Sequence, residues 1–151
     1  MGQGMRIPGD EARALFTRSR VARLATVDRA SIPHLVPVTF AVIDGPGAAS
    51  SSEVIVFAVD HKPKSTTALR RLENIAANPR VCFLVDHYDD NWEQLWWVRA
   101  DAEAGVLQGS VRDNAVSALV AKYPQYREHP PGGTVVGSAV VRWSGWRAAS
   151  Q

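Results

Sequence analysis

The sequence predicts a mainly β domain, a six-stranded antiparallel barrel with about three peripheral helices. Six apolar or β-branched stretches of strand length are separated by short turns, and three other stretches carry a helical pattern. The helical stretches do not alternate regularly with the strands, which argues against a doubly wound parallel sheet. A length of 151 residues with 46% hydrophobic residues is enough for one domain with a buried core.

The first half of the chain holds one expected helix and three expected strands. Asp10 can cap a short helix that has Leu15 and Phe16 on its inner face. Strands are expected at residues 20–27, 34–43 and 53–59, joined by a turn at 28–33 and a loop at 44–53. Pro37 lies inside the second of these strands, so the strand must have an edge position, a bulge or a bend there.

The second half continues with two helices and three strands. A helix at residues 66–77, with one apolar face, ends before Pro79. Strands at 80–88 and 94–107, a helix at 110–123, a loop at 124–134 and a last strand complete the chain. Residues 1–9 are expected to form a flexible segment ahead of a single domain at 10–151.

Two adjacent tryptophans stand out in the fifth strand. Trp96 and Trp97 must face opposite sides of the sheet, because side chains alternate along a strand. One indole can fill the barrel, and the other needs a cover such as a partner subunit or a flat ligand.

Several function classes are excluded or left without support. A net charge of +2 is too small for a dedicated nucleic-acid binder, and no apolar stretch approaches the length needed to span a membrane. The single cysteine, Cys82, is expected to be buried in an apolar strand. A single thiol excludes an intrachain disulfide framework and fits a reducing cytoplasm. No histidine pair has metal-ligand spacing, and no nucleophile with its base is recognisable, so no metal and no catalytic residue is predicted.

The stretch DHKPKSTTA, residues 60–68, is the clearest candidate site. It places two ammonium groups and three hydroxyls between a strand and a helix, where the first backbone N–H groups of the helix are unpaired and carry partial positive charge. Phosphate is the anion that best uses this set of donors. The alternative reading is an ordinary solvated turn with a serine N-cap.

Three segments together resemble a known superfamily. RLATVDRASIPHLVPVTFAV at residues 23–42 resembles the opening hairpin of the split β-barrel flavin and deazaflavin proteins, the relatives of pyridoxamine 5′-phosphate oxidase. Residues 60–88 resemble the cofactor turn, helix and next strand of that superfamily, and WWVRADAEA at 96–104 resembles its long central strand. The closest form is the actinobacterial branch that uses the deazaflavin coenzyme F420.

The resemblance implies a homodimer with two cofactor sites at its interface. The residues that it implies for the cofactor phosphate are Lys62, Lys64, Ser65 and Thr66. Those implied along the ring and ribityl chain are Ala58, Val59 and Asp60, and those on the other side of the ring are Pro37, Val38 and Thr39. Trp97 and Arg99 are implied to reach across from the second subunit. FMN-using relatives usually carry an arginine early on the strand before the turn, and residues 56–59 have none, which favours a deazaflavin over FMN.

The expected function is therefore that of a cytoplasmic F420-dependent oxidoreductase. It would transfer a hydride from the reduced deazaflavin to an unsaturated or conjugated organic molecule, with the cofactor supplying the chemistry. Lys62, Lys64, Arg70 and Arg71 could attract the acidic tail of F420, although the two arginines could equally be solvated helix charges. The alternatives are an FMN-dependent enzyme like pyridoxamine-phosphate oxidase and a non-catalytic protein that binds F420 or a flavin. The loops at 44–53 and 124–134 carry no specific pattern, so the substrate is not predicted.

Overall fold

The structure is a computed structural model that describes residues 4–45, 53–59 and 66–149 of the chain, with side chains of the second helix described from Leu69 onward. The helices are α1 (Gly9–Arg18), α2 (Thr66–Ala77), α3 (Gly109–Lys122) and α4 (Gln125–Glu128), with one 3-10 turn, η1 (Trp92–Gln94). The strands are β1 (Gly4–Arg6), β2 (Ala22–Val27), β3 (Pro33–Val38), β4 (Ala41–Asp44), β5 (Glu53–Ala58), β6 (Arg80–His87), β7 (Trp96–Val106) and β8 (Val135–Ala148).

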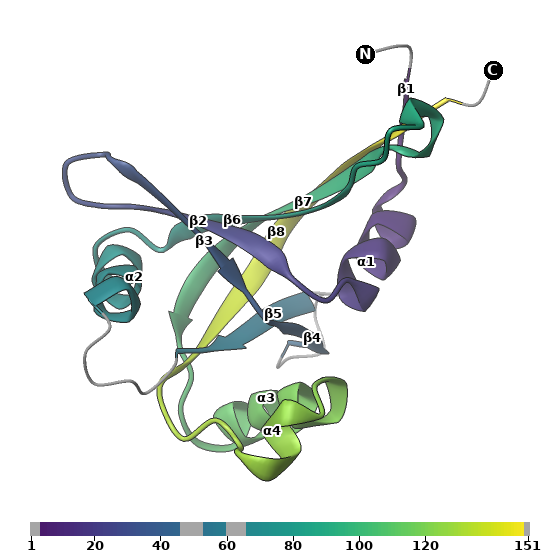
Figure 1. Cartoon of the computed structure of the whole chain (residues 1–151). Helices are drawn as coiled ribbons and strands as arrows, with labels where there is room; N and C mark the ends of the chain where they lie inside the picture. The colour runs from purple at the N-terminus through teal and green to yellow at the C-terminus, as the bar shows by residue number, and fades with distance from the viewer. Residues whose placement is uncertain (1–3, 46–52, 60–65, 150–151) are drawn as a thin grey trace.

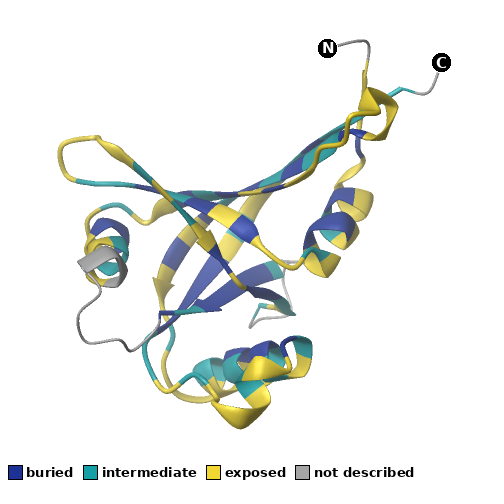
Figure 2. Cartoon of the chain, in the orientation of Figure 1, coloured by how far each residue is buried: buried dark blue, intermediate teal, exposed yellow. Residues whose placement is uncertain are grey.

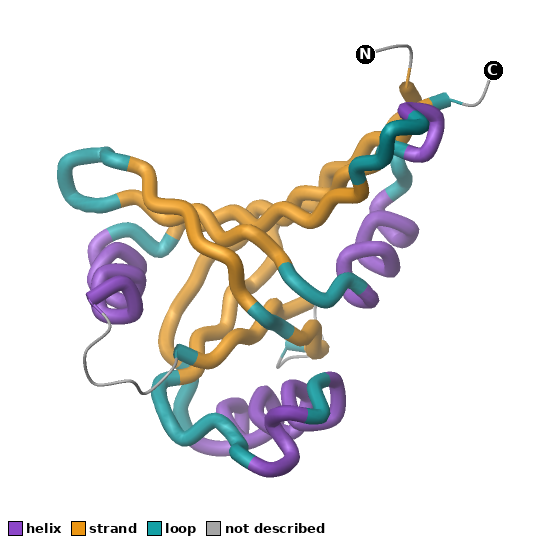
Figure 3. The backbone as a smooth tube through the Cα atoms, in the orientation of Figure 1, coloured by secondary structure: helices purple, strands orange, loops and turns teal. Residues whose placement is uncertain are grey.

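The strands form one antiparallel sheet in the order β3-β2-β6-β7-β8-β5-β4, and β1 pairs with the end of β8. The long strands β7 and β8 are neighbours in the middle of this order and run diagonally through the molecule (Figure 1). β5 pairs with the first residues of β8. The opposite end, beside α1, is an arm in which β7 and β8 are flanked by the end of β6 and by β1 (Figure 3). The sheet curls around a core, with α1 and α2 at its sides and α3 with α4 beyond β4 and β5.

The described residues form eight strands where the sequence predicted six. The stretch expected as one strand at 34–43 divides at Thr39 and Phe40 into β3, which pairs with β2, and β4, which pairs with β5. Pro37 lies in β3 at the edge of the sheet, as its missing N–H requires. Residues 4–6, expected to be flexible, pair with the end of β8 as β1, and the loop expected at 124–134 contains the short helix α4.

The main core lies inside the curled sheet and is rich in phenylalanine (Figure 2). Phe16 of α1 is fully buried, with its ring centroid 4.8 Å from that of Phe40 and 5.2 Å from that of Trp143. It also makes an edge contact with Phe83 of β6. Trp96 packs against this core while Trp97 faces the other side, which confirms that the two indoles are divided between the faces.

A second cluster joins α3 to β4, β5 and β8. At its edge the Tyr123 hydroxyl accepts the Phe40 N–H at 3.0 Å and lies 2.9 Å from the carbonyl oxygens of Arg20 and Phe40. The neighbouring Lys122 Nζ donates to the carbonyl oxygens of Thr17 and Ser19. These contacts hold the end of α3 against the bend between β3 and β4.

None of the helices in the described part of the chain combines the length and the apolar character needed to cross a bilayer.

Lys122 gives the fold a predicted pH dependence. Burial, followed by the charge of Arg20, lowers the pKa of Lys122 from 10.5 to about 8. Between those two values the unfolded chain holds a proton that the folded chain has lost, so stability should rise with pH above 8. Because Lys122 is only half-buried, we expect a gain of about 1 kcal/mol between pH 7.5 and 9.5 rather than the full value of the shift.

Urea unfolding of the wild type and of Lys122→Met across this range would measure the effect. The wild type should gain stability relative to the variant as the pH rises. Tyr123, whose pKa burial raises above 10, opposes this trend only at higher pH. Parallel stability curves for the two proteins would show that the ammonium group is not penalised in the fold.

Candidate functional site

A cavity of about 440 Å³ opens at the end of β5, directly before the segment that carries the predicted anion site. Ala58 and Val59 form one wall, and α4 with the chain that follows it forms the other. The residues lining that second wall are Gln125, Tyr126, His129, Pro130, Pro131, Gly132 and Gly133. The Val59 N–H donates to the Thr134 carbonyl at 2.8 Å, which fixes the end of β5 against this loop.

Thr39 connects this cavity to the bend between β3 and β4. Its hydroxyl lies 3.1 Å from the Tyr126 hydroxyl, and either group can donate the hydrogen bond. The contact joins two segments that are 87 residues apart in sequence. The wall of the cavity therefore depends on the split of the predicted second strand, which carries Thr39 toward α4.

A polar cluster lies between α2 and the inner side of β2 and β3. The Asn74 amide donates to the Thr26 hydroxyl at 3.1 Å, and both side chains are almost completely buried. His34 is opposite Thr26 in the sheet, and its Nδ1 is buried without a hydrogen-bond partner. Arg71 lies one helical turn before Asn74, and its guanidinium is 5.9 Å from the centroid of the Phe57 ring.

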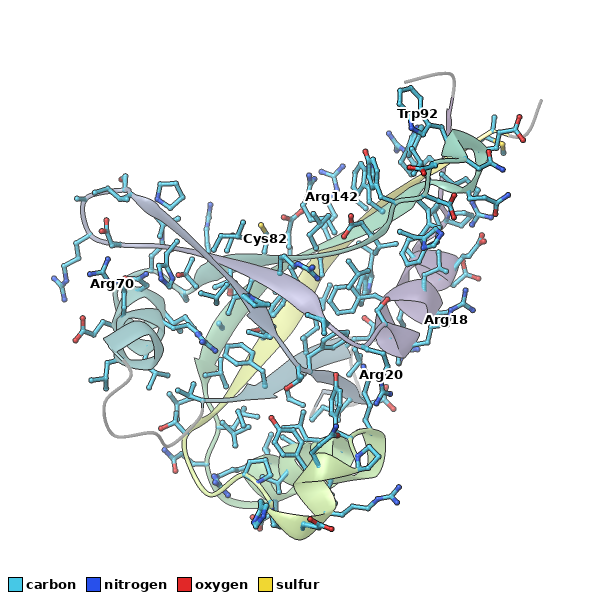
Figure 4. The ribbon with its side chains drawn as sticks, viewed as in Figure 1. Arg18, Arg20, Arg70, Cys82, Trp92 and Arg142 are labelled. Atoms are coloured by element: carbon cyan, nitrogen blue, oxygen red, sulfur yellow. The ribbon has the colours of Figure 1, made fainter. Side chains whose placement is uncertain are left out.

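Arg71 is the unusual member of this cluster. It is partly buried, its Nε has no hydrogen-bond partner, and it makes no ion pair with a carboxylate of the described residues. Burial lowers the pKa of its guanidinium below the usual value. A guanidinium remains charged in proteins, so a buried and unpaired one favours the binding of an anion. Arg70, the neighbouring cation, is exposed and points away from the protein (Figure 4).

The outer face of the sheet is a second region of interest. None of the described helices lies on this face, and Arg142 and Cys82 project from it (Figures 1 and 4). The register places Trp146 opposite Trp97, Ser144 opposite Arg99, and Arg142 opposite Asp101. Cys82, predicted to be buried, is half-exposed here, and burial together with Asp101 raises the pKa of its thiol, so little reactive thiolate forms.

A cavity of about 350 Å³ opens on this outer face where β1, β7 and β8 meet. We call it the arginine cavity. Its lining residues are Arg6, Ile7, Trp97, Arg99, Arg142, Trp143, Ser144, Gly145 and Trp146. It shares no lining residue with the cavity at the end of β5.

The predicted site residues therefore fall into separate groups. Ala58 and Val59 line the cavity at the end of β5, and Thr39 contacts its wall. Pro37 is exposed on the edge strand whereas Val38 is buried in the core, because neighbours in a strand face opposite sides. Trp97 and Arg99, expected to reach across from the second subunit, line the arginine cavity of their own protomer. Thr66 begins α2, and Asp60, Lys62, Lys64 and Ser65 lie outside the described residues.

The sequence left one candidate undecided and gave no sign of two others. Arg71 was left open between an anion ligand and a solvated charge, and only its burial decides between the two. Tyr126 and His129 belong to a loop without a sequence pattern, and they reach the cavity through the position of α4. In the described part of the chain, no three His, Cys, Asp or Glu side chains gather closely enough to hold a metal ion.

Comparison with known proteins places this arrangement in a family. The sequence matches the family described as pyridoxamine 5′-phosphate oxidase over residues 8–147. No curated protein is significantly similar to it in sequence. Two solved structures with a similar fold are a FAD-binding protein from Mesorhizobium loti (TM-score 0.67, 20% identity, 98% of both chains) and a conserved hypothetical protein from Mycobacterium tuberculosis (TM-score 0.68, 21% identity, 93% of this chain and 85% of that one).

A third is the heme storage protein of Vibrio cholerae, with a TM-score of 0.61 and 12% identity over 90% of this chain and 92% of that one. At such identities the structural similarity shows a shared fold, and the sequence match over most of the chain shows the family. The curled antiparallel sheet with helices at its sides is the split β-barrel that the resemblance predicted. The chain therefore belongs to the pyridoxamine 5′-phosphate oxidase family.

Proposed function

We propose that this protein is an F420-dependent oxidoreductase that binds the deazaflavin at the cavity at the end of β5. The observation that carries the proposal is Arg71, a partly buried cation without a described carboxylate partner, on the helix that follows the predicted phosphate turn. With Lys62 and Lys64 of that turn, it would give the cofactor phosphate and the acidic tail a strongly positive environment.

In this proposal the bound deazaflavin supplies the hydride. Ala58 and Val59 present the apolar end of β5 to the ring, and the fixed contact of Val59 with Thr134 keeps that wall in place. The hydrogen bond between Thr39 and Tyr126 closes one side of the cavity and holds a phenol and a hydroxyl near the bound molecule. These residues orient the ring and limit the access of water, while the substrate brings the acceptor bond.

A homodimer is part of the same proposal. The outer sheet face is free of described helices and exposes apolar side chains, including Leu35, which is 67% exposed, and Leu84. A second copy is a suitable cover, because exposed apolar patches of this kind usually mark an interface. Trp97 and Arg99 lie on this face, so they would be at the interface of such a dimer. Sedimentation equilibrium should give twice the chain mass of 16.4 kDa.

The test of function is a comparison of cofactors followed by turnover. Calorimetry with F420, FMN and FAD should give the tightest binding for F420, and reduced F420 should be oxidised in the presence of conjugated acceptors. Tighter binding of FMN or FAD would favour the flavin enzyme, and a FAD-binding protein from Mesorhizobium loti does share the fold. Tight F420 binding without turnover would favour the non-catalytic carrier, and absence of F420 binding would refute the proposal. A cytoplasmic location, where the single thiol stays reduced, is proposed with it.

Lys64→Ala should weaken F420 binding while the protein stays folded. Loss of one charge-assisted contact to a phosphate costs about 1.5–3 kcal/mol, roughly a 10- to 150-fold increase in Kd. Arg70→Ala is the matched control, because it removes a cation from the exposed side of α2 only. Equal affinities of the Lys64 variant and the wild type would place the phosphate elsewhere.

A further inference from the structure

The arginine cavity presents donors and no acceptor side chain other than a serine hydroxyl. Arg6, Arg99 and Arg142 line it, and no carboxylate does. Among the described residues, Arg6 and Arg142 make no ion pair. Three like charges around one cavity repel one another, and an anion is the ligand that would relieve the repulsion.

Two carboxylates lie near this cluster. Asp86 is opposite Trp97 in the register. Asp101 Oδ1 is 3.5 Å from Arg99 Nε, an ion-pair distance, but the geometry makes no hydrogen bond. Both side chains are about 40% exposed, at 41% and 40%, so solvent weakens the pair. Two carboxylates against three guanidiniums still leave the cavity with a net positive charge.

Two further features of the cavity remain unpaired in the described structure. The Ser144 hydroxyl is buried, lies opposite Arg99 in the register, and has no hydrogen-bond partner. Arg99 Nε is likewise buried without a hydrogen bond. Buried polar atoms are almost always paired, so two unpaired atoms in one cavity point to a ligand that completes them. An oxyanion can accept from both.

The walls of the cavity suit a flat molecule. Trp97 and Trp146 lie opposite each other on neighbouring strands of the same face, and the Arg99 guanidinium is 5.8 Å from the centroid of the Trp97 ring. Gly4 of β1 permits this arrangement, because a Cβ there would lie 1.8 Å from Trp146 Nε1. The absence of a side chain at residue 4 thus lets the Trp146 indole lie across β1.

An irregularity in β8 positions the third arginine. The register changes between Asp101 and Ala102, whose partners are Arg142 and Val140, so Val141 is left without a partner on β7. Such an extra residue re-aims the side chains beside it and is common next to functional sites. Here it sets Arg142 in register with Asp101, on the face that carries Arg99 and Trp97.

We infer that the arginine cavity binds a planar organic anion, which is an aromatic or conjugated carboxylate or phosphate. The anionic group is held by Arg6, Arg99, Arg142 and Ser144. The flat part of the molecule lies against Trp97 and Trp146. The two cavities share no lining residue, so this anion site is separate from the proposed cofactor cavity. Binding of the anion itself depends on this cavity alone.

The inference is tested by calorimetry of the full-length protein with two matched probes. One is the anion 2-naphthoate, and the other is the neutral 2-naphthamide. Naphthoate should bind and naphthamide should bind at least about tenfold more weakly, because only the former gains charge-assisted hydrogen bonds. Arg6→Gln with Arg142→Gln should weaken naphthoate binding by about tenfold or more and leave naphthamide unchanged, and Arg142→Lys should retain part of the affinity. Arg18→Gln on the exposed side of α1 is the control and should not change it (Figure 4).

Equal binding of the two probes to the wild type would overturn the inference. So would unchanged naphthoate binding by the double variant, provided that its melting temperature equals that of the wild type. F420 titrations of the same variants separate it from the proposed function. Loss of F420 binding in the double variant would show that the cavity holds the cofactor and not a separate anion. Naphthoate binding by a wild type that does not bind F420 would leave the anion site standing while the proposed function fails.

Discussion

Arg71→Met is expected to raise the Kd for F420 by roughly 30-fold or more, without lowering the melting temperature. A buried cation that contacts a phosphate contributes about 2–5 kcal/mol to binding, because its removal leaves the anion buried and unpaired. In the free protein the same cation is partly buried without a described carboxylate, so its replacement by an apolar side chain of similar length removes a desolvation penalty. The variant should therefore lose affinity and keep or gain stability.

This combination separates an anion ligand from a structural arginine. A structural role for Arg71, through its contact with the Phe57 ring, would lower stability and affinity together. Arg70→Met, on the exposed side of the same helix, should change neither quantity by much. Fluorescence titration with F420 and differential scanning calorimetry of the three proteins give both readouts. Unchanged F420 affinity in Arg71→Met would remove the observation on which the proposed cofactor site depends.

Phe16→Ala is expected to lower the free energy of unfolding by about 3–5 kcal/mol. Phe16 is fully buried and contacts aromatic rings from β6, from β8 and from the bend between β3 and β4. Its removal leaves a cavity that these strands cannot fill, because they are held by the hydrogen bonds of the sheet. A loss of this size is a large part of the stability of a domain of this length.

Urea unfolding monitored by circular dichroism would measure the loss. Phe16→Leu keeps most of the volume and should lose clearly less stability than the alanine variant. Thr17→Ala is the surface control on the same helix, because its exposed hydroxyl contacts only the carbonyl of Arg13 in the preceding turn. Equal and small losses for both Phe16 variants would mean that α1 is not part of the cooperative core.

Most of the strands could be predicted from local sequence because each carries its own pattern. The alternation in Ala22–Val27 and the apolar run in Arg80–His87 identify strands whatever they pair with. The division at Thr39 and Phe40 could not be seen in this way. The residues on both sides favour strands, and the break exists because β3 pairs with β2 while β4 pairs with β5.

The candidate site shows the same division between local and long-range information. The charges and hydroxyls of residues 60–68 are adjacent in sequence, so their common placement between a strand and a helix follows from the chain itself. The environment of Arg71 does not follow from the sequence. Arg70 and Arg71 are adjacent residues of the same type, and only the packing of α2 buries one of them.

The sequence by itself determined a mainly β family member with a basic segment after its third expected strand, because strand patterns act over a few neighbours. Only the tertiary structure decided that Thr39 meets Tyr126, that Trp97 and Arg99 lie apart from Ala58 and Val59, and that Arg6 joins Arg99 and Arg142 around one cavity. These neighbours come from strands far apart in the chain, and their meeting depends on strand order and register, which no short window of sequence contains.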